Sequence, residues 1–145
     1  NRHLAFVPIS IMSHPSGLQL TRTVVAWLPS VVVMVGIFVV SGMSSPPMSS
    51  EIPDLGAHAG VYAVLGASFV FGLAGANWRR VTFNRIVLAT ICAFVYGISD
   101  EFHQSFVPGR TAEFRDVIAD FCGAAVGTGA TLVWSIVLAS RGRGQ

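Results

Sequence analysis

Polar side chains interrupt an otherwise apolar chain, and their spacing would place them on helix faces. Asp54, His58 and Tyr62 lie four residues apart, so a helix would carry all three on one stripe. Asp116 and Asp120 repeat this spacing, and Asp120 would lie about 6 Å further along its helix. Carboxylates and an imidazole can exchange protons, bind cations or accept hydrogen bonds. Both stripes are therefore candidate positions for chemistry.

A third polar group lies between these stripes. Glu101 and Gln104 close an apolar stretch, and Arg110 follows the turn predicted at Pro108-Gly109. The planar guanidinium of arginine suits a phosphate or a carboxylate. We expect the three groups to meet in an outward-facing polar pocket formed by Asp54, His58, Tyr62, Glu101, Gln104, Arg110, Asp116 and Asp120. We expect their neighbours Asp100, His103, Glu113 and Arg115 to be solvated boundary charges.

Simpler interpretations exist for these residues. His58 can be a buried hydrogen-bonding group, Tyr62 an interfacial side chain, and Glu101 with Arg110 a structural ion pair. Histidine and carboxylates can also form a zinc or manganese site. The chain contains no His-Glu-x-x-His motif and no cofactor signature, so we predict neither a metal nor a cofactor.

The charges are sorted along the chain. All seven acidic residues fall between Glu51 and Asp120, and only Arg110 and Arg115 share loops with them, so these loops carry −5. The other basic residues, which sum to +7, are Arg2, Arg22, Arg79, Arg80, Arg85, Arg141 and Arg143. Arginine-rich loops of membrane proteins stay in the cytoplasm. This pattern predicts that both termini are cytoplasmic and that the acidic residues face outward.

Composition and charge-free stretches indicate the class of fold. The chain is 52% hydrophobic and 11% charged, against about 25% charged residues in soluble domains. Charge-free stretches cover residues 23–50, 55–78, 86–99 and 121–140. A membrane span needs roughly 20 residues. The third stretch gives only about 21 Å of helix, so its helix must extend to Arg85, or to Asp100, Glu101 and Gln104. We predict an all-α integral membrane protein with four transmembrane helices in a bundle.

The same patterns divide the chain into three parts. Residues 1–21 are predicted to form a cytoplasmic N-terminal segment, in which Met12 is a plausible native start. Residues 22–140 form the four-helix domain, and residues 141–145 a cytoplasmic tail. Because the arginines are divided among several loops, the basic pI does not predict nucleic-acid binding. Gly123 and Gly127 continue the Asp116–Asp120 stripe and predict close helix packing.

Three strings carry a resemblance to a known family. They are Asp54-x3-His58-x3-Tyr62-x2-Leu65-Gly66, Asp100-Glu101-x-His103-Gln104-x-Phe106-x-Pro108-Gly109-Arg110 and Asp116-Val117-x-Ala119-Asp120-x2-Gly123, which continues to Gly127. In order and spacing they resemble the VanZ-like family of small bacterial membrane proteins, named for a teicoplanin-resistance protein. The chain departs from the family's pattern at Leu55, where lysine is common, at Asp120, where asparagine is common, and in lacking the serine after Arg110. These departures concern the ligand more than the architecture.

The resemblance implies a multi-pass protein of the bacterial inner (cytoplasmic) membrane and the cell envelope. In some members it implies lowered susceptibility to teicoplanin-type glycopeptides. We expect a non-enzymatic protein whose pocket binds membrane lipids, a lipid-linked cell-wall component or a glycopeptide; oligomer formation is left open. One alternative is an outer-leaflet enzyme acting on a lipid-linked substrate, with Glu101 and Asp120 as acid and base and His58 as proton shuttle. A second is a structural assembly module.

Overall fold

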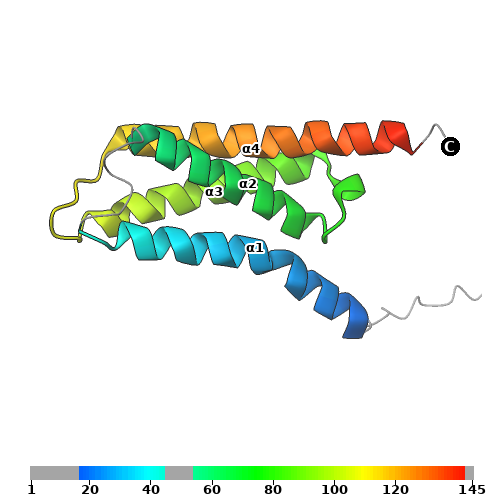
Figure 1. Cartoon of the computed structure of the whole chain (residues 1–145), viewed down its shortest axis with the longest axis horizontal. Helices are drawn as coiled ribbons and strands as arrows, with labels where there is room; N and C mark the ends of the chain where they lie inside the picture. The colour runs from blue at the N-terminus through cyan, green and yellow to red at the C-terminus, as the bar shows by residue number, and fades with distance from the viewer. Residues whose placement is uncertain (1–16, 45–53, 143–145) are drawn as a thin grey trace, which may run out of the picture.

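The computed structural model describes residues 17–44 and 54–142, and these form a bundle of long helices (Figure 1). Its elements are α1 (Gly17–Ser41), α2 (Asp54–Leu73), the short 3-10 helix η1 (Trp78–Arg80), α3 (Phe83–Gln104) and α4 (Phe114–Arg141). Within the described ranges there are no strands, and α1 to α4 are each long and apolar enough to cross a membrane. The predicted all-α, four-span fold is therefore confirmed. Met12 lies outside the described residues.

Helix α3 extends beyond its charge-free stretch at both ends. Its 22 residues correspond to about 33 Å of helix. The helix includes Arg85 near its start and Asp100, Glu101 and Gln104 in its last turns. These last three side chains are buried, at 5%, 6% and 2% exposure. The short third stretch thus correctly predicted that polar residues complete this span.

Helices α2 and α4 are in backbone contact. A Cβ atom added to Gly127 would lie 1.9 Å from the carbonyl oxygen of Ala63, and one added to Gly123 would lie 2.1 Å from that of Ala59. No side chain fits in such a space, so glycine is required at both α4 positions. Small residues allow this approach in membrane bundles, where packing rather than hydrophobic burial drives association. The predicted role of Gly123 and Gly127 is confirmed.

Helix α1 lies at the edge of the bundle and is the least buried of the four (Figure 1). It contains Pro29, which cannot donate a backbone hydrogen bond, and the ribbon bends along its length. Its contacts with the other helices include the following two. The Trp27 ring packs directly against Gly72 of α2, and its closest ring atom is 2.8 Å from the position that a Cβ would take there. The Tyr96 hydroxyl of α3 donates to the Met34 carbonyl at 2.7 Å.

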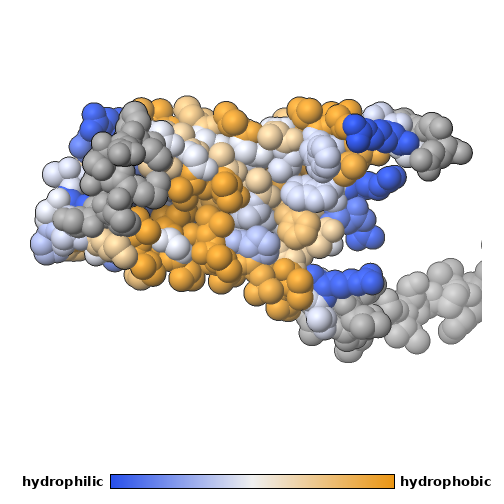
Figure 2. Space-filling model, in the orientation of Figure 1, coloured by the Kyte–Doolittle hydropathy of each residue, from blue (hydrophilic) through white to orange (hydrophobic). Residues whose placement is uncertain are grey.

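The surface consists of an apolar band between two polar ends (Figure 2). Large apolar side chains such as Val32 and Val126 are more than 60% exposed within the band. Arg22, at the start of α1, and Arg141, at the end of α4, lie at one end of the bundle, here called the arginine end. The end of α3 and the start of α4, which carry the acidic residues, lie at the other. Such a band is the expected exterior of a membrane protein.

Candidate functional site

Polar residues from three helices converge at the acidic end of the bundle. Helix α2 begins there, α3 ends there, and α4 begins there, so segments far apart in sequence lie side by side (Figure 1). We define the polar cluster as His58, Tyr62, Asp100, Glu101, Gln104, Arg110, Asp116 and Asp120. Its carboxylates are all buried. Buried charges in membrane proteins persist where they pair or serve a function.

The centre of the polar cluster is a contact between α2 and α4. His58 Nδ1 lies 3.0 Å from Asp120 Oδ1, with side-chain exposures of 11% and 0%. Glu101 of α3 completes the group, because one ligand-type atom from each of the three residues lies within 4.8 Å of the others. The predicted positions on three helices are thus brought together in space. Such a group can hold a proton, a cation or a polar ligand.

The loop after α3 brings Arg110 back into contact with the end of α3. The Arg110 N–H donates to the Val107 carbonyl at 3.1 Å, and Gly109 between them has φ 82°. Proline followed by a positive-φ glycine fits a type II turn, so the predicted turn is confirmed. Arg110 Nη2 then donates to Gln104 Oε1 at 2.7 Å. The turn therefore sets the direction of the guanidinium.

Glu101 connects the cluster to the start of α4. Its Oε2 accepts the backbone N–H of Glu113 at 2.9 Å, and its Oε1 accepts from Gln104 Nε2 at 3.3 Å. Helix α4 begins at the next residue, Phe114, and Glu113 makes no side-chain cap of its own. Within the described residues, Arg110 reaches Glu101 only through Gln104, so the alternative of a direct Glu101–Arg110 ion pair is wrong.

Asp100 belongs to the cluster, contrary to our expectation of a solvated charge. It is 5% exposed, and its Oδ2 accepts from Gln104 Nε2 at 3.0 Å. The spacing of four between Asp100 and Gln104 was the signal that could have identified this partnership. His103 also departs from that expectation, since its half-buried ring stacks on Phe38 at a centroid distance of 4.6 Å.

Glu113 and Arg115 fit the expectation of solvated charges. They pair with each other at 2.5 Å, with side chains 39% and 65% exposed. A pair so open to solvent contributes little to stability, about 0 to 1 kcal/mol. Both residues therefore provide matched controls for substitutions inside the cluster.

The structure describes the remaining predicted residues to different extents. Tyr62 is 1% exposed, which excludes a simple interfacial role, and its hydroxyl has no hydrogen-bond partner in the described part of the chain. Asp116 is buried in the first turn of α4. Asp54 begins α2, but its side chain lies outside the described residues.

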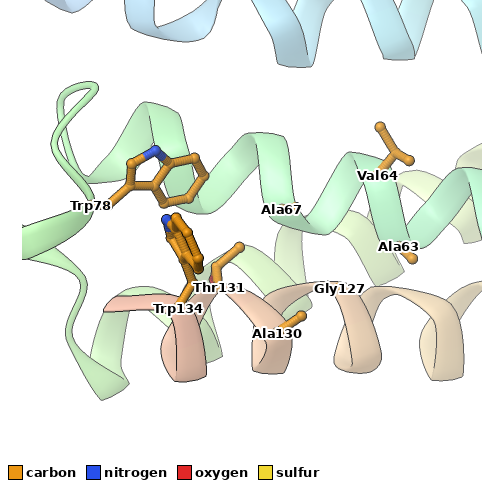
Figure 3. Close-up of a pocket in the computed structure, with 8 residues that line it drawn as sticks. All are labelled: Ala63, Val64, Ala67, Trp78, Gly127, Ala130, Thr131 and Trp134. Atoms are coloured by element: carbon orange, nitrogen blue, oxygen red, sulfur yellow. The ribbon is translucent and has the colours of Figure 1, made fainter. Parts of the chain in front are cut away.

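An apolar groove that shares no residue with the polar cluster lies over α2, η1 and α4 (Figure 3). It has a volume of about 420 Å³ and is lined by residues of α2, η1 and α4: Ala63, Val64, Ala67, Trp78, Gly127, Ala130, Thr131 and Trp134. The lining has no ionisable side chain, so this groove is not the predicted polar pocket. Its two tryptophans face each other at the end nearer η1 (Figure 3).

Fold and site together define a multi-pass helical membrane protein with a buried polar cluster between its helices. The VanZ/LLP1 family model matches residues 27–137, which include every member of the cluster, and the chain belongs to this family. It is therefore a VanZ-like protein of the cell envelope, as the resemblance predicted. No curated protein and no solved structure gives a match.

Proposed function

We propose that the polar cluster binds the anionic head group of a lipid or lipid-linked envelope component at the outer face of the bacterial cytoplasmic membrane. The observation that carries the proposal is the state of Arg110. The only hydrogen-bond acceptor of its guanidinium among the described residues is the neutral amide of Gln104, and its buried Nε has no partner there. An arginine without a bonded carboxylate retains donors for a phosphate or carboxylate ligand.

Head-group binding would explain the teicoplanin resistance for which the family is named. A teicoplanin-type glycopeptide acts on a membrane-anchored target at the outer leaflet. A protein that occupies or rearranges lipid-linked components there would reduce access of the drug. We therefore propose that this chain lowers susceptibility to teicoplanin-type glycopeptides without turning over a substrate. Support comes from the family membership and from the position of Arg110 at the acidic end of the bundle.

The orientation required by this proposal can be tested by cysteine labelling. In a background with Cys92→Ala and Cys122→Ala, exposed Thr111→Cys should react with a membrane-impermeant maleimide in intact cells. Exposed Ser140→Cys, beside the arginine end, should react only after the membrane is opened, because positive loops stay cytoplasmic. The reverse labelling pattern would contradict both the orientation and the proposed outer site.

Arg110→Ala should abolish protection against teicoplanin while leaving the protein in the membrane. Loss of a charge-assisted hydrogen bond costs about 1.5 to 3 kcal/mol, which corresponds to roughly 10- to 100-fold weaker head-group binding. Susceptibility to teicoplanin and vancomycin would be measured in a susceptible Gram-positive host, with membrane abundance checked for each variant. Arg110→Lys should give intermediate protection, because the charge remains but the planar fork is lost.

Arg115→Ala is the matched control, since this arginine lies nearby in the first turn of α4 but pairs at the surface with Glu113. It should protect as well as the wild type. Full protection by Arg110→Ala would rule out the proposed role of the guanidinium. If a well-inserted wild type gives no protection, the resistance part of the proposal is wrong. Lipids that co-purify with wild type but not with Arg110→Ala would then test head-group binding directly.

A further inference from the structure

We propose that His58, Glu101 and Asp120 bind a divalent transition-metal ion, zinc or manganese, between α2, α3 and α4. One ligand-type atom from each residue lies within 4.8 Å of the other two, and His58 Nδ1 is 3.0 Å from Asp120 Oδ1. Ligands about 2.0 to 2.1 Å from a tetrahedral ion are about 3.3 Å apart. His58 Nδ1 and Asp120 Oδ1 are within about 0.3 Å of this separation, and the widest ligand pair would need to close by at most about 1.5 Å.

The chemistry of the three donors fits such an ion. One imidazole nitrogen and two carboxylate oxygens form a mixed set that suits zinc, while the carboxylates also suit manganese. Both carboxylates are buried, at 6% and 0% exposure for Glu101 and Asp120. A protonated His58 would offset only one of their two negative charges, whereas a dication offsets both. Three protein ligands leave a coordination position open for water or an anionic oxygen.

The second carboxylate oxygen of Asp120 provides an independent observation. Asp120 is wholly buried, and its Oδ2 has no hydrogen-bond partner among the described residues. A Cβ at Gly97 of α3 would lie 2.8 Å from this oxygen, so the missing side chain leaves room for the carboxylate. A buried acceptor without a partner costs about 1 to 3 kcal/mol, more if charged. Coordination of a cation by both Asp120 oxygens, so that Oδ2 as well as Oδ1 is a ligand, would remove this cost.

The ligand set is invisible in sequence because each ligand comes from a different helix. Sequence motifs for metals rely on ligands a few residues apart, whereas His58 and Asp120 are 62 residues apart. The inference goes beyond head-group binding and does not depend on it, because an ion here would cross-link three helices by itself. Metal content and resistance can therefore fail separately.

The test measures metal bound to the full-length protein. The chain is purified in detergent with a tag free of histidine, stripped with a chelator, incubated with zinc or manganese, and desalted. Mass spectrometry of the metal should find about one zinc or manganese ion per chain, and the ion retained identifies the natural one. Addition of that ion should also raise the melting temperature, since ligands that bind only the folded state stabilise it.

Isosteric variants locate the site. Asp120→Asn and Glu101→Gln should each weaken metal binding by more than tenfold, since even changes to residues around a metal ligand cost about 10- to 100-fold. His103→Ala and Glu113→Gln, which lie outside the three ligands, should retain the ion. If an isosteric variant does not fold, the metal content and melting shift of the wild type decide the question. A folded wild type that retains neither ion overturns the proposal, as does equal loss of metal in His103→Ala.

Discussion

Gly127→Ala is expected to separate α2 from α4 and to leave little folded protein. The added Cβ would lie 1.9 Å from the carbonyl oxygen of Ala63 and 2.6 Å from its carbonyl carbon. These are backbone atoms of a helix, so they cannot rotate away as a side chain would. Overpacking of a core costs typically about 1 to 3 kcal/mol. Because the obstacle here is main chain, we expect a loss at or above the upper end of this range.

Gly129→Ala is the matched control on the same helix. A Cβ at Gly129 would meet no atom within 4 Å, and alanine is the better helix former by up to about 1 kcal/mol. This variant should melt at or above the wild-type temperature. Thermal unfolding in detergent, together with size-exclusion chromatography and yield from membranes, would compare the two. Equal melting temperatures for Gly127→Ala and Gly129→Ala would show that the helices do not approach as described.

Asp120→Ala is expected to produce the second large loss of stability. It removes the partner of His58 and leaves a cavity where α2, α3 and α4 meet. Removal of one partner from a buried pair costs about 3 to 5 kcal/mol. Asp120→Asn should cost less, because an amide oxygen still accepts from His58 Nδ1 and the shape is kept. Unfolding would be measured on chelator-treated protein, so that any bound metal does not contribute.

Glu113→Ala serves as the control for Asp120→Ala, because it removes a surface carboxylate on the same helix start. We expect it to change stability by less than about 1 kcal/mol. Similar stability of the two variants would refute the proposed role of Asp120 in joining the helices. Asp120→Asn also separates two functions of the cluster. Loss of protection with retained stability would locate function there, whereas parallel losses would favour a structural assembly module.

The bundle could be predicted because a membrane imposes few and simple rules. Charge-free lengths gave the spans, and the short third stretch required α3 to include buried polar residues, as Glu101 and Gln104 show. Spacings of four correctly assigned His58 to one helix face and Asp120 to another. The small residues Gly123 and Gly127 predicted close packing, although their partner helix was not predictable from one chain.

Details of the cluster depended on three-dimensional contacts that spacing does not encode. The sequence alone suggests that Asp100 is a boundary charge. In the structure Gln104, on the same helix face, donates a hydrogen bond to its carboxylate. Arg110 was expected near carboxylates, yet its bond goes to the amide of Gln104 because the type II turn directs it there. The proximity of His58, Glu101 and Asp120 follows from how three helices rotate about their axes. The spacing of residues along a single helix does not determine this rotation.

The pairing of α2 with α4, rather than with a neighbour in sequence, has a consequence for synthesis. His58 emerges from the ribosome 62 residues before its partner Asp120. At about 5 to 20 residues per second, α2 waits roughly 3 to 12 s in or near the bilayer before the carboxylate of Asp120 can reach its imidazole. Chains that stop after α3 never receive the missing helix. Nascent and truncated forms are therefore the ones that we expect membrane proteases to recognise, and completion of α4 is the event that protects the chain from degradation.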